Sequence, residues 1–377
     1  MAKDKIKVLH TVLNLGFAGL ERVVTELSLA TDKSVYDVEV CCFQRKGYFA
    51  EILEKDGVTV SLIPRKESGT DWSLPKTLAR YIKEKEIDVL HTHTGTFWFS
   101  AIGGKLARVP AIVYTDHGRF LIEPKVRLFE DFISARLADK SVAVSAELRD
   151  YMIKRVKFPA KKMAVVLNGV NTETFAPGPK PENLLSEFKL SPQTKVLGCV
   201  ASFNPVKDHA TILDAFKLIK ESYDDVVLSF IGDGPLREKI EEKIKTLGLQ
   251  GSVFLTGKRE DVPDLLRLMD IFLLFSLSEG TSMSVAEAMA SGLAVVVTDV
   301  GGNPSLVDDG TNGLLVKPQQ PQQMAEAVLS LLKDDARRQT FGNEAVEKVK
   351  RSYSVRAMAD KYSKIYREIL RKKGHIL

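Results

Sequence analysis

Short runs of consecutive apolar residues alternate along this chain with stretches in which apolar residues recur at helical spacing. This alternation predicts buried parallel strands, covered by helices on both faces of a sheet. In the first half, the predicted strands cover residues 5–13, 38–43, 58–63, 87–92, 111–115 and 140–144. Helical patterns cover residues 20–30, 48–55 and 74–84. The pattern therefore predicts a doubly wound α/β domain over residues 1–170.

A composition change then interrupts the pattern. The segment NTETFAPGPKPENLLSE, which starts at Asn171, is polar and rich in proline, so residues 171–190 are predicted to be a linker. The alternation restarts afterwards, with predicted strands at residues 195–202, 226–232, 253–257, 271–276, 294–299 and 313–318. Helical patterns cover residues 209–222, 235–248, 262–269 and 283–291. The sequence thus predicts a second doubly wound domain over residues 191–353, and such sheets bind ligands beyond the carboxyl ends of their strands.

Length and cysteine content agree with a two-domain protein of a reducing compartment. The 377 residues exceed one ordinary hydrophobic core. The apolar runs all fall short of the roughly 20 residues that a membrane helix needs, and the N-terminal residues are expected to form a strand rather than a signal peptide. Cys41, Cys42 and Cys199 have the spacing of neither a disulfide framework nor a zinc site. We therefore expect a cytoplasmic protein, soluble or peripheral on the inner face of the membrane.

Charge differs between the two halves. Residues 1–180 hold 28 Lys and Arg against 22 Asp and Glu, a balance of +6, whereas residues 181–377 hold 26 against 27, a balance of −1. The positive first half indicates either an anionic partner or membrane surface, or an ordinary solvated surface with a small excess of lysine. Nucleic acid is not an expected partner.

The segment that starts at Ser276, SLSEGTSMSVAEAMASGLAVVVTD, predicts a strand, a polar turn, a helix and a second strand. Glu279 lies in the turn, and Glu287 follows eight residues later in the helix. The first amides of a helix have no internal partner and lie at the positive end of its dipole, so they suit a diphosphate. The two carboxylates can accept hydrogen bonds from hydroxyl groups of a sugar and a ribose. By itself, the same pattern also fits a capped helix without a ligand.

Together with its flanks, this segment resembles the family-4 glycosyltransferases, which use sugar nucleotides and have the GT-B fold. The resemblance covers nearly the whole chain, through the strings NLGFAGLERVVTEL, IDVLHTHT, VYTDHG, SVAVSAELRDYM, VLNGVNTETFAP, FIGDGPLREKIE, VFLTGKREDVPDLL and GGNPSLVDDGTNGLLV. It implies two Rossmann-like domains that face each other across a cleft, the first binding the acceptor and the second the nucleotide sugar. It also implies that a C-terminal helix, at about residues 354–377, crosses back to the first domain. The reaction implied is sugar transfer with retention at the anomeric carbon, without a metal ion or a cofactor.

The resemblance also assigns roles to individual residues. Glu279 matches an acidic residue that contacts the donor sugar, Lys207 a lysine that neutralises the donor diphosphate, and His117 a histidine near the transferred sugar. A fixed cation beside the diphosphate, as expected of Lys207, would stabilise the negative charge that grows on the leaving group. The residues expected to bind the donor are Gly16, Gly19, Ser202, Gly232, Gly257, Arg259, Gly280, Thr281, Ser282, Met283 and Glu287. Without the resemblance, His117 would fit a structural histidine, Lys207 an exposed charge at a helix start, and the first two glycines an ordinary turn.

The chain departs from the family pattern beside Lys207. The family usually has an arginine a few residues earlier, and Ser202 stands there in this chain, or Asn204 if the alignment shifts. Arg22 or Arg119 is the hypothesised substitute. A metal-dependent transferase typically carries an Asp-any-Asp triplet in a loop after a strand, and the predicted strand-end loops contain none.

The donor expected first is a UDP-sugar and second GDP-mannose, and the expected acceptor is a glycan or a lipid-linked sugar. Two alternatives share this fold. A nucleotide-sugar epimerase would act on the donor alone, and a non-catalytic nucleotide-sugar-binding subunit would explain the missing arginine. A dinucleotide-dependent oxidoreductase fits least well, because GFAGLE is only a partial Gly-rich fingerprint and lacks an acidic partner at the end of the next strand.

A basic segment of the first half also has two interpretations. Lys125, Arg127, Arg136 and Lys140 are interleaved with the apolar residues Leu128, Phe129, Phe132 and Ile133. This pattern fits either an amphipathic helix that touches an anionic membrane or the buried face of an ordinary helix.

Overall fold

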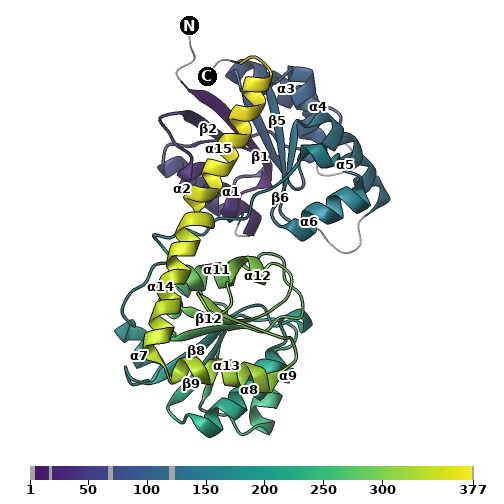
Figure 1. Cartoon of the computed structure of the whole chain (residues 1–377). Coiled ribbons are helices and arrows are strands. Elements are labelled where there is room, and N and C mark those ends of the chain that lie inside the picture. Colours follow the sequence, from purple (N-terminus) through teal and green to yellow (C-terminus); the bar gives the residue numbers. More distant parts are fainter. Residues whose placement is uncertain (1–4, 17–18, 67–70, 119–123, 376–377) are drawn as a thin grey trace. The chain divides into compact units, whose positions relative to one another are not determined.

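The computed structural model describes residues 5–16, 19–66, 71–118 and 124–375 (Figure 1). Its chain divides into two compact units, Met1–Gly169 with Val355–Leu377, and Val170–Ser354. Each unit is built on one parallel sheet with helices around it. The prediction of two doubly wound α/β units is therefore confirmed.

The first unit has these strands: β1 Ile6–Asn14, β2 Tyr36–Arg45, β3 Thr59–Leu62, β4 Val89–His93, β5 Ala111–Asp116, β6 Lys140–Ala143 and β7 Met163–Val165. Its α-helices are α1 Gly19–Ala30, α2 Tyr48–Lys55, α3 Leu74–Lys85, α4 Phe97–Ala107, α5 Lys125–Leu137, α6 Ala146–Tyr151 and α15 Val355–Lys372. The strands lie in the order β3-β2-β1-β4-β5-β6-β7, and neighbouring strands are parallel. The order reverses between β1 and β4, so the loops after these two strands lead away from each other.

The second unit has these strands: β8 Lys195–Val200, β9 Val226–Ile231, β10 Val253–Gly257, β11 Ile271–Leu274, β12 Ala294–Thr298 and β13 Gly313–Val316. Its α-helices are α7 Glu182–Phe188, α8 His209–Ser222, α9 Arg237–Thr246, α10 Val262–Leu268, α11 Met283–Ala290, α12 Asn303–Leu306, α13 Pro321–Leu332 and α14 Asp335–Ser352. The order of this parallel sheet is β10-β9-β8-β11-β12-β13. Its order reverses between β8 and β11.

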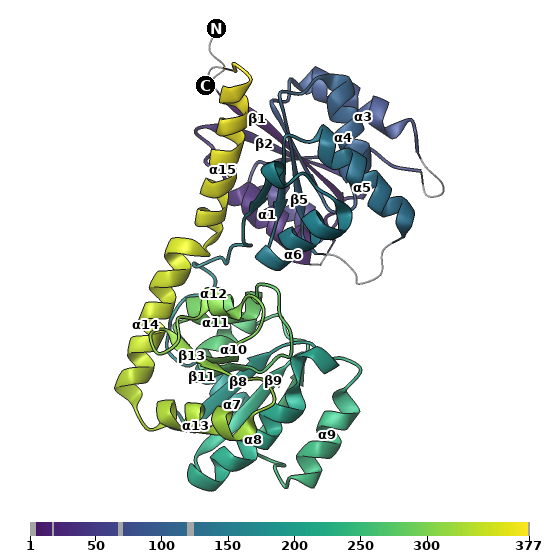
Figure 2. The ribbon, with the colours of Figure 1, turned by 45° about the vertical axis from the view of Figure 1, so that its right-hand side comes forward.

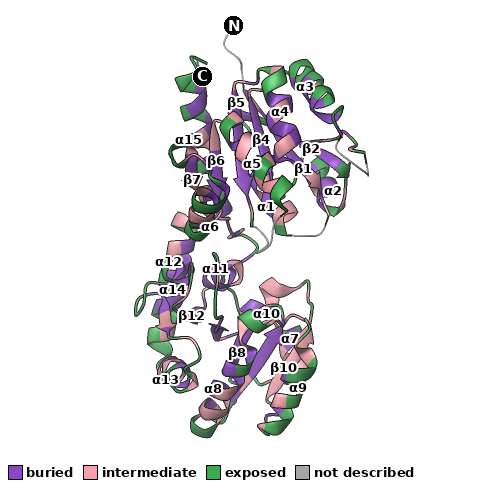
Figure 3. Cartoon of the chain, turned by 90° about the vertical axis from the view of Figure 1, so that its right-hand side faces the viewer, coloured by how far each residue is buried: buried purple, intermediate pink, exposed green. Residues whose placement is uncertain are grey.

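The central strands of both sheets are buried, the edge strands β3 and β10 are less so, and exposed positions lie mainly on the outer faces of the helices (Figure 3). Because side chains alternate along a strand, each sheet has two apolar faces. In the first unit, Val8, Val89 and Val113 lie in one cluster with residues of α1 and α15. Leu9, Leu90 and Ile112 lie in a second cluster with residues of α3 and α4. Burial on both faces explains why the strands appear in the sequence as continuous apolar runs.

The C-terminal helix α15 packs in the first unit, beside its sheet (Figures 1 and 2). Two of its tyrosines reach into the sheet: Tyr362 Oη lies 2.9 Å from Thr115 Oγ1, and Tyr366 Oη lies 2.6 Å from Nδ1 of His91. Ser363 Oγ lies 2.6 Å from Tyr36 Oη at the start of β2. Apolar contact and these polar contacts together fix the helix against the sheet.

Several segments differ from the prediction. No element was predicted for the residues that form α4, α6, β7, α12, α13 and α14. The helix α4 is apolar on most sides, so its sequence lacks the amphipathic pattern of a surface helix. The stretch 171–190 contains α7, in which Leu184 is fully buried. Among the described residues, none of the helices combines the length and the apolar character that crossing a bilayer requires.

Candidate functional site

A close ion pair occupies the switch point of the second sheet. Lys207 ends the 3₁₀ turn Pro205–Lys207 after β8, and Glu279 lies in the loop after β11. Lys207 Nζ is 2.5 Å from Glu279 Oε1, and Ser276 Oγ donates a hydrogen bond of 2.5 Å to the same oxygen. The two charged side chains are 21% and 8% exposed. The structure thus brings together two of the three residues assigned to the reaction, at the crevice where open α/β sheets bind ligands.

Local hydrogen bonds fix the turn that carries Lys207. The side chain of Asn204 accepts a hydrogen bond from the Val206 amide, which starts the turn. Asp208 follows in the left-handed region at φ +43°, and its carboxylate accepts from the Thr211 amide at the start of α8. The Leu277 amide donates to the Val206 carbonyl at 2.7 Å, so the β8 and β11 loops are joined through their backbones.

Glycines allow a third loop to pack against Glu279. Gly301, after β12, has φ +53°, and a Cβ atom at this position would lie 1.7 Å from the Glu279 carbonyl oxygen. The next amide, of Gly302, donates to the Gly280 carbonyl at 3.1 Å. Only a residue without a side chain fits at Gly301. The role of these two glycines was not predicted, although a Gly-Gly pair directly after a strand is a signal for close backbone approach.

The start of α11 lies directly after Glu279. Gly280 and Thr281 precede Ser282, which is the N-cap residue, and Met283 begins the helix. A Cβ atom on Gly280 would meet no other atom within 4 Å, so there is open space beside the backbone here. The helix amides point to this end and give it a positive potential. Glu287 lies in the second turn of the same helix and is 9% exposed.

The remaining predicted donor residues of this unit lie at the end of β10 and in the loops after β8, β9 and β10. Gly232 has φ +142°, and a Cβ there would lie 2.1 Å from the Ala201 carbonyl oxygen. Its amide donates to the Gly257 carbonyl at 2.9 Å, and Gly257 itself has φ +72°. Ser202 Oγ accepts a hydrogen bond from the Asn204 side chain. Gly232 and Gly257 therefore have a conformational role here, whatever they bind.

Two of the predicted cationic residues, Arg259 and Arg22, are engaged in ion pairs. Arg259 bonds to Glu187 on α7 and to Asp261, and these hydrogen bonds raise the pKa of the guanidinium above its usual value. Arg22 on α1 donates to Glu26 at 3.1 Å. Arg119 lies outside the described residues. Arg259 thus ties α7 to the β10 loop, a role that the sequence pattern did not indicate.

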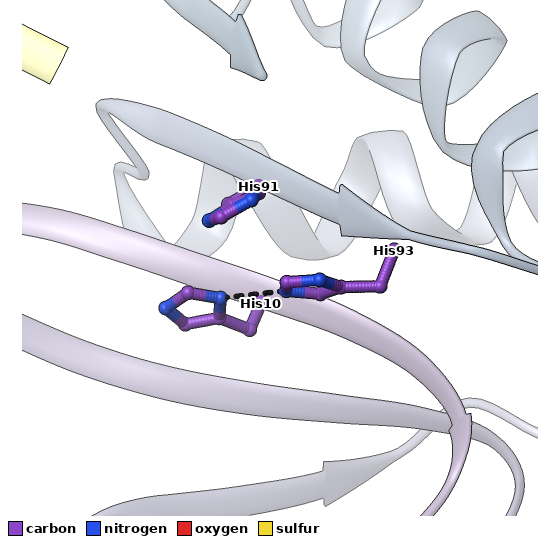
Figure 4. A group of neighbouring side chains, drawn as sticks. All are labelled: His10, His91 and His93. Atoms are coloured by element: carbon purple, nitrogen blue, oxygen red, sulfur yellow. Dashed lines mark hydrogen bonds between the residues drawn. The ribbon is translucent and has the colours of Figure 1, made fainter. Parts of the chain in front are cut away.

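The first unit contains a cluster of four imidazoles towards the carboxyl end of its sheet, three of them buried and that of His117 partly buried. His10 lies on β1, His91 and His93 lie on β4, and His117 directly follows β5. His10 Nδ1 is 3.0 Å from His93 Nε2, as Figure 4 shows, and His93 Nδ1 is 2.9 Å from His117 Nε2. Burial lowers the pKa of His10 to about 3 and that of His117 to about 4, and it holds the pKa values of His91 and His93 well below the usual range. All four rings are therefore neutral near pH 7.

The three histidines His10, His91 and His93 are also close enough to be considered as metal ligands, since their nitrogens lie within 4.8 Å of one another. However, both nitrogens of His91 already have hydroxyl partners, Thr115 Oγ1 at 2.7 Å and Tyr366 Oη at 2.6 Å. The facing nitrogens of His10 and His93 bond to each other. Hydrogen bonds thus engage both nitrogens of His91 and of His93 and the Nδ1 of His10, so the cluster fits a polar network better than a metal centre.

The predicted glycine loop of the first unit lies after β1. The Gly16 amide donates to the Asn14 side chain at 2.8 Å, and Gly19 is the first residue of α1. The first sheet reverses its strand order between β1 and β4, so this loop and His93 belong to its switch point. Of the four clustered histidines, only His117 was predicted as a functional residue. The others lie within or directly after predicted strands, in the strings VLHTVL and VLHTHT, and their meeting depends on strand register, which the sequence does not specify.

Comparison with known proteins supports a common assignment for both units. Residues 17–174 match the family described as Glycosyltransferase Family 4, and residues 182–348 match Glycosyl transferases group 1. An Escherichia coli enzyme, UDP-Gal:alpha-D-GlcNAc-diphosphoundecaprenol alpha-1,3-galactosyltransferase, is 26% identical over 96% of this chain and 97% of its own.

Solved structures share the fold. A glycosyltransferase from Rickettsia africae has a TM-score of 0.83, with 21% identity, over 98% of this chain and 99% of that one. Anabaena HepE in complex with UDP has a TM-score of 0.78, with 21% identity, over 97% of this chain and 100% of that one. HepE has also been solved with UDP-glucose. These similarities show that the chain has the fold of the GT-B glycosyltransferases.

The buried histidines predict that the first unit loses stability in mild acid. An unfolded histidine binds a proton near pH 6.5, whereas in the folded chain the pKa is about 3 for His10 and about 4 for His117. At a pH between the folded and the unfolded pKa values, the unfolded chain binds more protons than the folded chain. The free energy of unfolding should therefore be at its full value above pH 6.5 and should fall as the pH drops from 6.5 towards 4. Hydrogen exchange of the β4 amides at several pH values measures this. Equal protection at pH 7 and pH 5 would contradict the assignment of neutral buried rings.

Proposed function

The chain belongs to the family-4 glycosyltransferases, and on this basis we propose that it transfers a sugar from a UDP-sugar to a lipid-linked or glycan acceptor. We further propose that transfer retains the anomeric configuration and needs no metal ion. The observation that carries the proposal is the contact of Lys207 with Glu279, beside the open N-terminal end of α11. A cation, a carboxylate that can accept from sugar hydroxyls and the amides at a helix start are the groups that suit a nucleotide-sugar donor.

The choice of donor and acceptor is supported by relatives. The E. coli relative uses UDP-Gal and acts on a diphosphoundecaprenol-linked sugar, as its name states. Solved complexes of HepE contain UDP and UDP-glucose. A UDP-sugar is therefore preferred to GDP-mannose, and a polyprenyl-diphosphate-linked sugar is the first acceptor to test.

Lys207 has the position and the chemistry to stabilise the leaving group. In the transfer, the bond from the anomeric carbon to the diphosphate oxygen breaks, and the acceptor oxygen bonds to the same carbon from the same face. The acceptor's proton passes to the departing diphosphate. Negative charge grows on that diphosphate, and Lys207 together with the amides at Gly280 to Met283 would stabilise it. The ammonium has three N–H donors, so it can keep Glu279 while another donor bonds to a phosphate oxygen.

Glu279 is proposed to orient the donor sugar. Its Oε1 is occupied by Lys207 and Ser276, and the carboxylate has further lone pairs that can accept from sugar hydroxyls. Lys207 and Ser276 hold the carboxylate in place before the donor arrives, so little ordering is needed on binding. The missing arginine leaves Lys207 as the proposed main cation for the diphosphate.

The membrane is a proposed partner through α5. Val126 and Phe129 on this helix are 68% and 63% exposed. They lie three residues apart, hence on one side of the helix, and Lys125 and Arg136 are exposed on the same element. Exposed apolar and basic side chains together are typical of helices that lie in an anionic membrane surface. A lipid-linked acceptor would be reached from such a surface.

A prediction about activity concerns Lys207. Lys207→Gln should lower kcat by about 100- to 1,000-fold, as for the loss of one group that stabilises a developing anion. Lys217→Gln is the matched control, because Lys217 is a half-exposed lysine on α8 that pairs only with the i+4 glutamate Glu221 in the described structure. Initial rates with a panel of nucleotide sugars and polyprenyl-diphosphate-linked acceptors measure the effect, and the anomeric proton of the product reports retention.

Three results would contradict the proposal. Normal turnover of Lys207→Gln would remove the lysine from the reaction. Loss of activity in EDTA that Mg²⁺ or Mn²⁺ restores would show that a metal is needed. A new sugar isomer formed from donor alone would favour an epimerase, and nucleotide binding without transfer to any acceptor would favour a non-catalytic subunit.

A prediction about membrane binding concerns α5. Replacing both Val126 and Phe129 by serine should abolish co-sedimentation with anionic liposomes, since it removes the apolar surface that would insert. Leu106→Ser on α4, at a site that is 50% exposed, is the control and should bind normally. Binding of the wild-type chain should weaken as salt increases. Absence of binding, or binding that is indifferent to salt and to the serine substitutions, would remove the membrane from the proposal.

A further inference from the structure

Three of the four clustered histidines form a continuous line that ends at His117. We name His10, His93 and His117 the histidine chain. Its two links are His10 Nδ1 to His93 Nε2 at 3.0 Å and His93 Nδ1 to His117 Nε2 at 2.9 Å. Both nitrogens of the middle ring are therefore used, and both links join ring nitrogens with no other atom between them.

Strand register produces this line. His10 on β1 pairs with His91 on β4, and His93 on β4 pairs with Thr115 on β5. Since side chains alternate between the two faces of a sheet, residues two apart lie on the same face. His91 and His93 thus share a face, as do Thr115 and, just beyond the end of β5, His117. The sheet brings the three rings of the histidine chain from three neighbouring strands to one side.

The protons of the histidine chain cannot be arranged independently. Each neutral ring carries one N–H, and a link between two ring nitrogens needs one N–H and one lone pair. Only two arrangements satisfy both links. Either His10 donates to His93 and His93 to His117, which leaves an N–H on His117 Nδ1, or all three reverse, which leaves a lone pair there. Any other arrangement sets two lone pairs or two N–H groups face to face.

The outer end of the histidine chain is the nitrogen that has no partner. His10 and His93 are 1% exposed, whereas His117 is only partly buried and lies at the carboxyl end of β5. Its Nδ1 is shielded from solvent and has no hydrogen-bond partner among the described residues. A buried nitrogen without a hydrogen-bond partner destabilises the folded chain, because the atom has lost its bond to water and gained none in return. A hydroxyl of a bound sugar would remove this destabilisation.

The two arrangements exchange the N–H and the lone pair between the two ends of the histidine chain, and these ends lie in different surroundings, since His10 is 1% exposed and His117 is only partly buried. The two arrangements therefore differ in free energy. We propose that one of them predominates, so that His10 and His93 are positioning residues that hold His117 in a single tautomer and its Nδ1 presents one hydrogen-bonding form to a sugar hydroxyl. This inference rests on the proposed function for the sugar, but the fixed tautomer itself is a property of the unliganded chain. Which nitrogen of a histidine carries the proton is set by the bond that its other nitrogen makes. Here that bond is made by His93, whose own tautomer is set by His10.

His91 provides a matched control within the same cluster. Its ring is as deeply buried and lies 4.3 Å from that of His93, centroid to centroid. Its two nitrogens, however, bond to Thr115 and to Tyr366 on α15 and make no link of the histidine chain. A substitution of His91 therefore disturbs packing and stability in the same region without breaking the chain.

The test measures the tautomer of His117 directly. We would label the histidine rings of the full chain with ¹⁵N and record the shifts of the two His117 nitrogens at pH 7.5. A single fixed tautomer gives two widely separated shifts. His93→Phe removes both links and His10→Phe removes the inner one, so either variant should bring the two His117 shifts closer together as the tautomers mix. His91→Phe should leave them apart. If one phenylalanine variant does not fold, the other answers the question.

Turnover distinguishes failure of this inference from failure of the proposed function. His93→Phe should lower kcat roughly 10- to 100-fold and change KM for the donor little, because a wrong tautomer weakens an interaction made during transfer. Averaged His117 shifts in the wild-type chain, or separated shifts that persist in both His93→Phe and His10→Phe, would overturn the inference even if the enzyme is active. Absence of sugar transfer by the wild-type chain would instead overturn the proposed function.

Discussion

The ion pair between Lys207 and Glu279 is the interaction on which the candidate site depends. Both side chains are largely removed from water, and a buried charge without a partner is costly. The pair therefore restricts the loops after β8 and β11 to conformations that keep the lysine and the glutamate together. The Leu277 to Val206 backbone bond and the close approach of Gly301 to Glu279 reinforce this arrangement. A donor diphosphate would enter a site in which its cation is already fixed.

The two sheets use the same geometric rule for different chemistry. In each, the order of strands reverses once, and polar side chains gather at the carboxyl ends of the two strands that flank the reversal. In the second unit these side chains are charged, which suits a diphosphate. In the first unit they are neutral imidazoles and hydroxyls, which suit the uncharged hydroxyl groups of a sugar. This difference supports the proposed division between a unit that binds the donor diphosphate and a unit that contacts the transferred sugar and binds the acceptor.

Much of the fold was predictable because a strand that is buried on both faces of its sheet consists of consecutive apolar residues, which are visible in the sequence. The pattern located α2 and β10 at their observed bounds, and it predicted twelve of the observed strands. It missed the short elements α6, β7 and α12 and the helices α13 and α14, and it missed α4, whose apolar surface hides the helical period. Site residues were predictable only where they lie within a recognisable sequence motif, as Glu279 and the start of α11 do. Contacts between distant segments, such as His10 with His93 or Gly301 with Glu279, depend on register and loop packing, which a single sequence does not specify.

The most direct test of the account is the position of the diphosphate in a crystal structure of the full chain with a bound UDP-sugar. The account predicts a phosphate oxygen about 3 Å from Lys207 Nζ, with further phosphate oxygens bonded to the amides at the start of α11. A diphosphate bound away from both the lysine and those amides would contradict it.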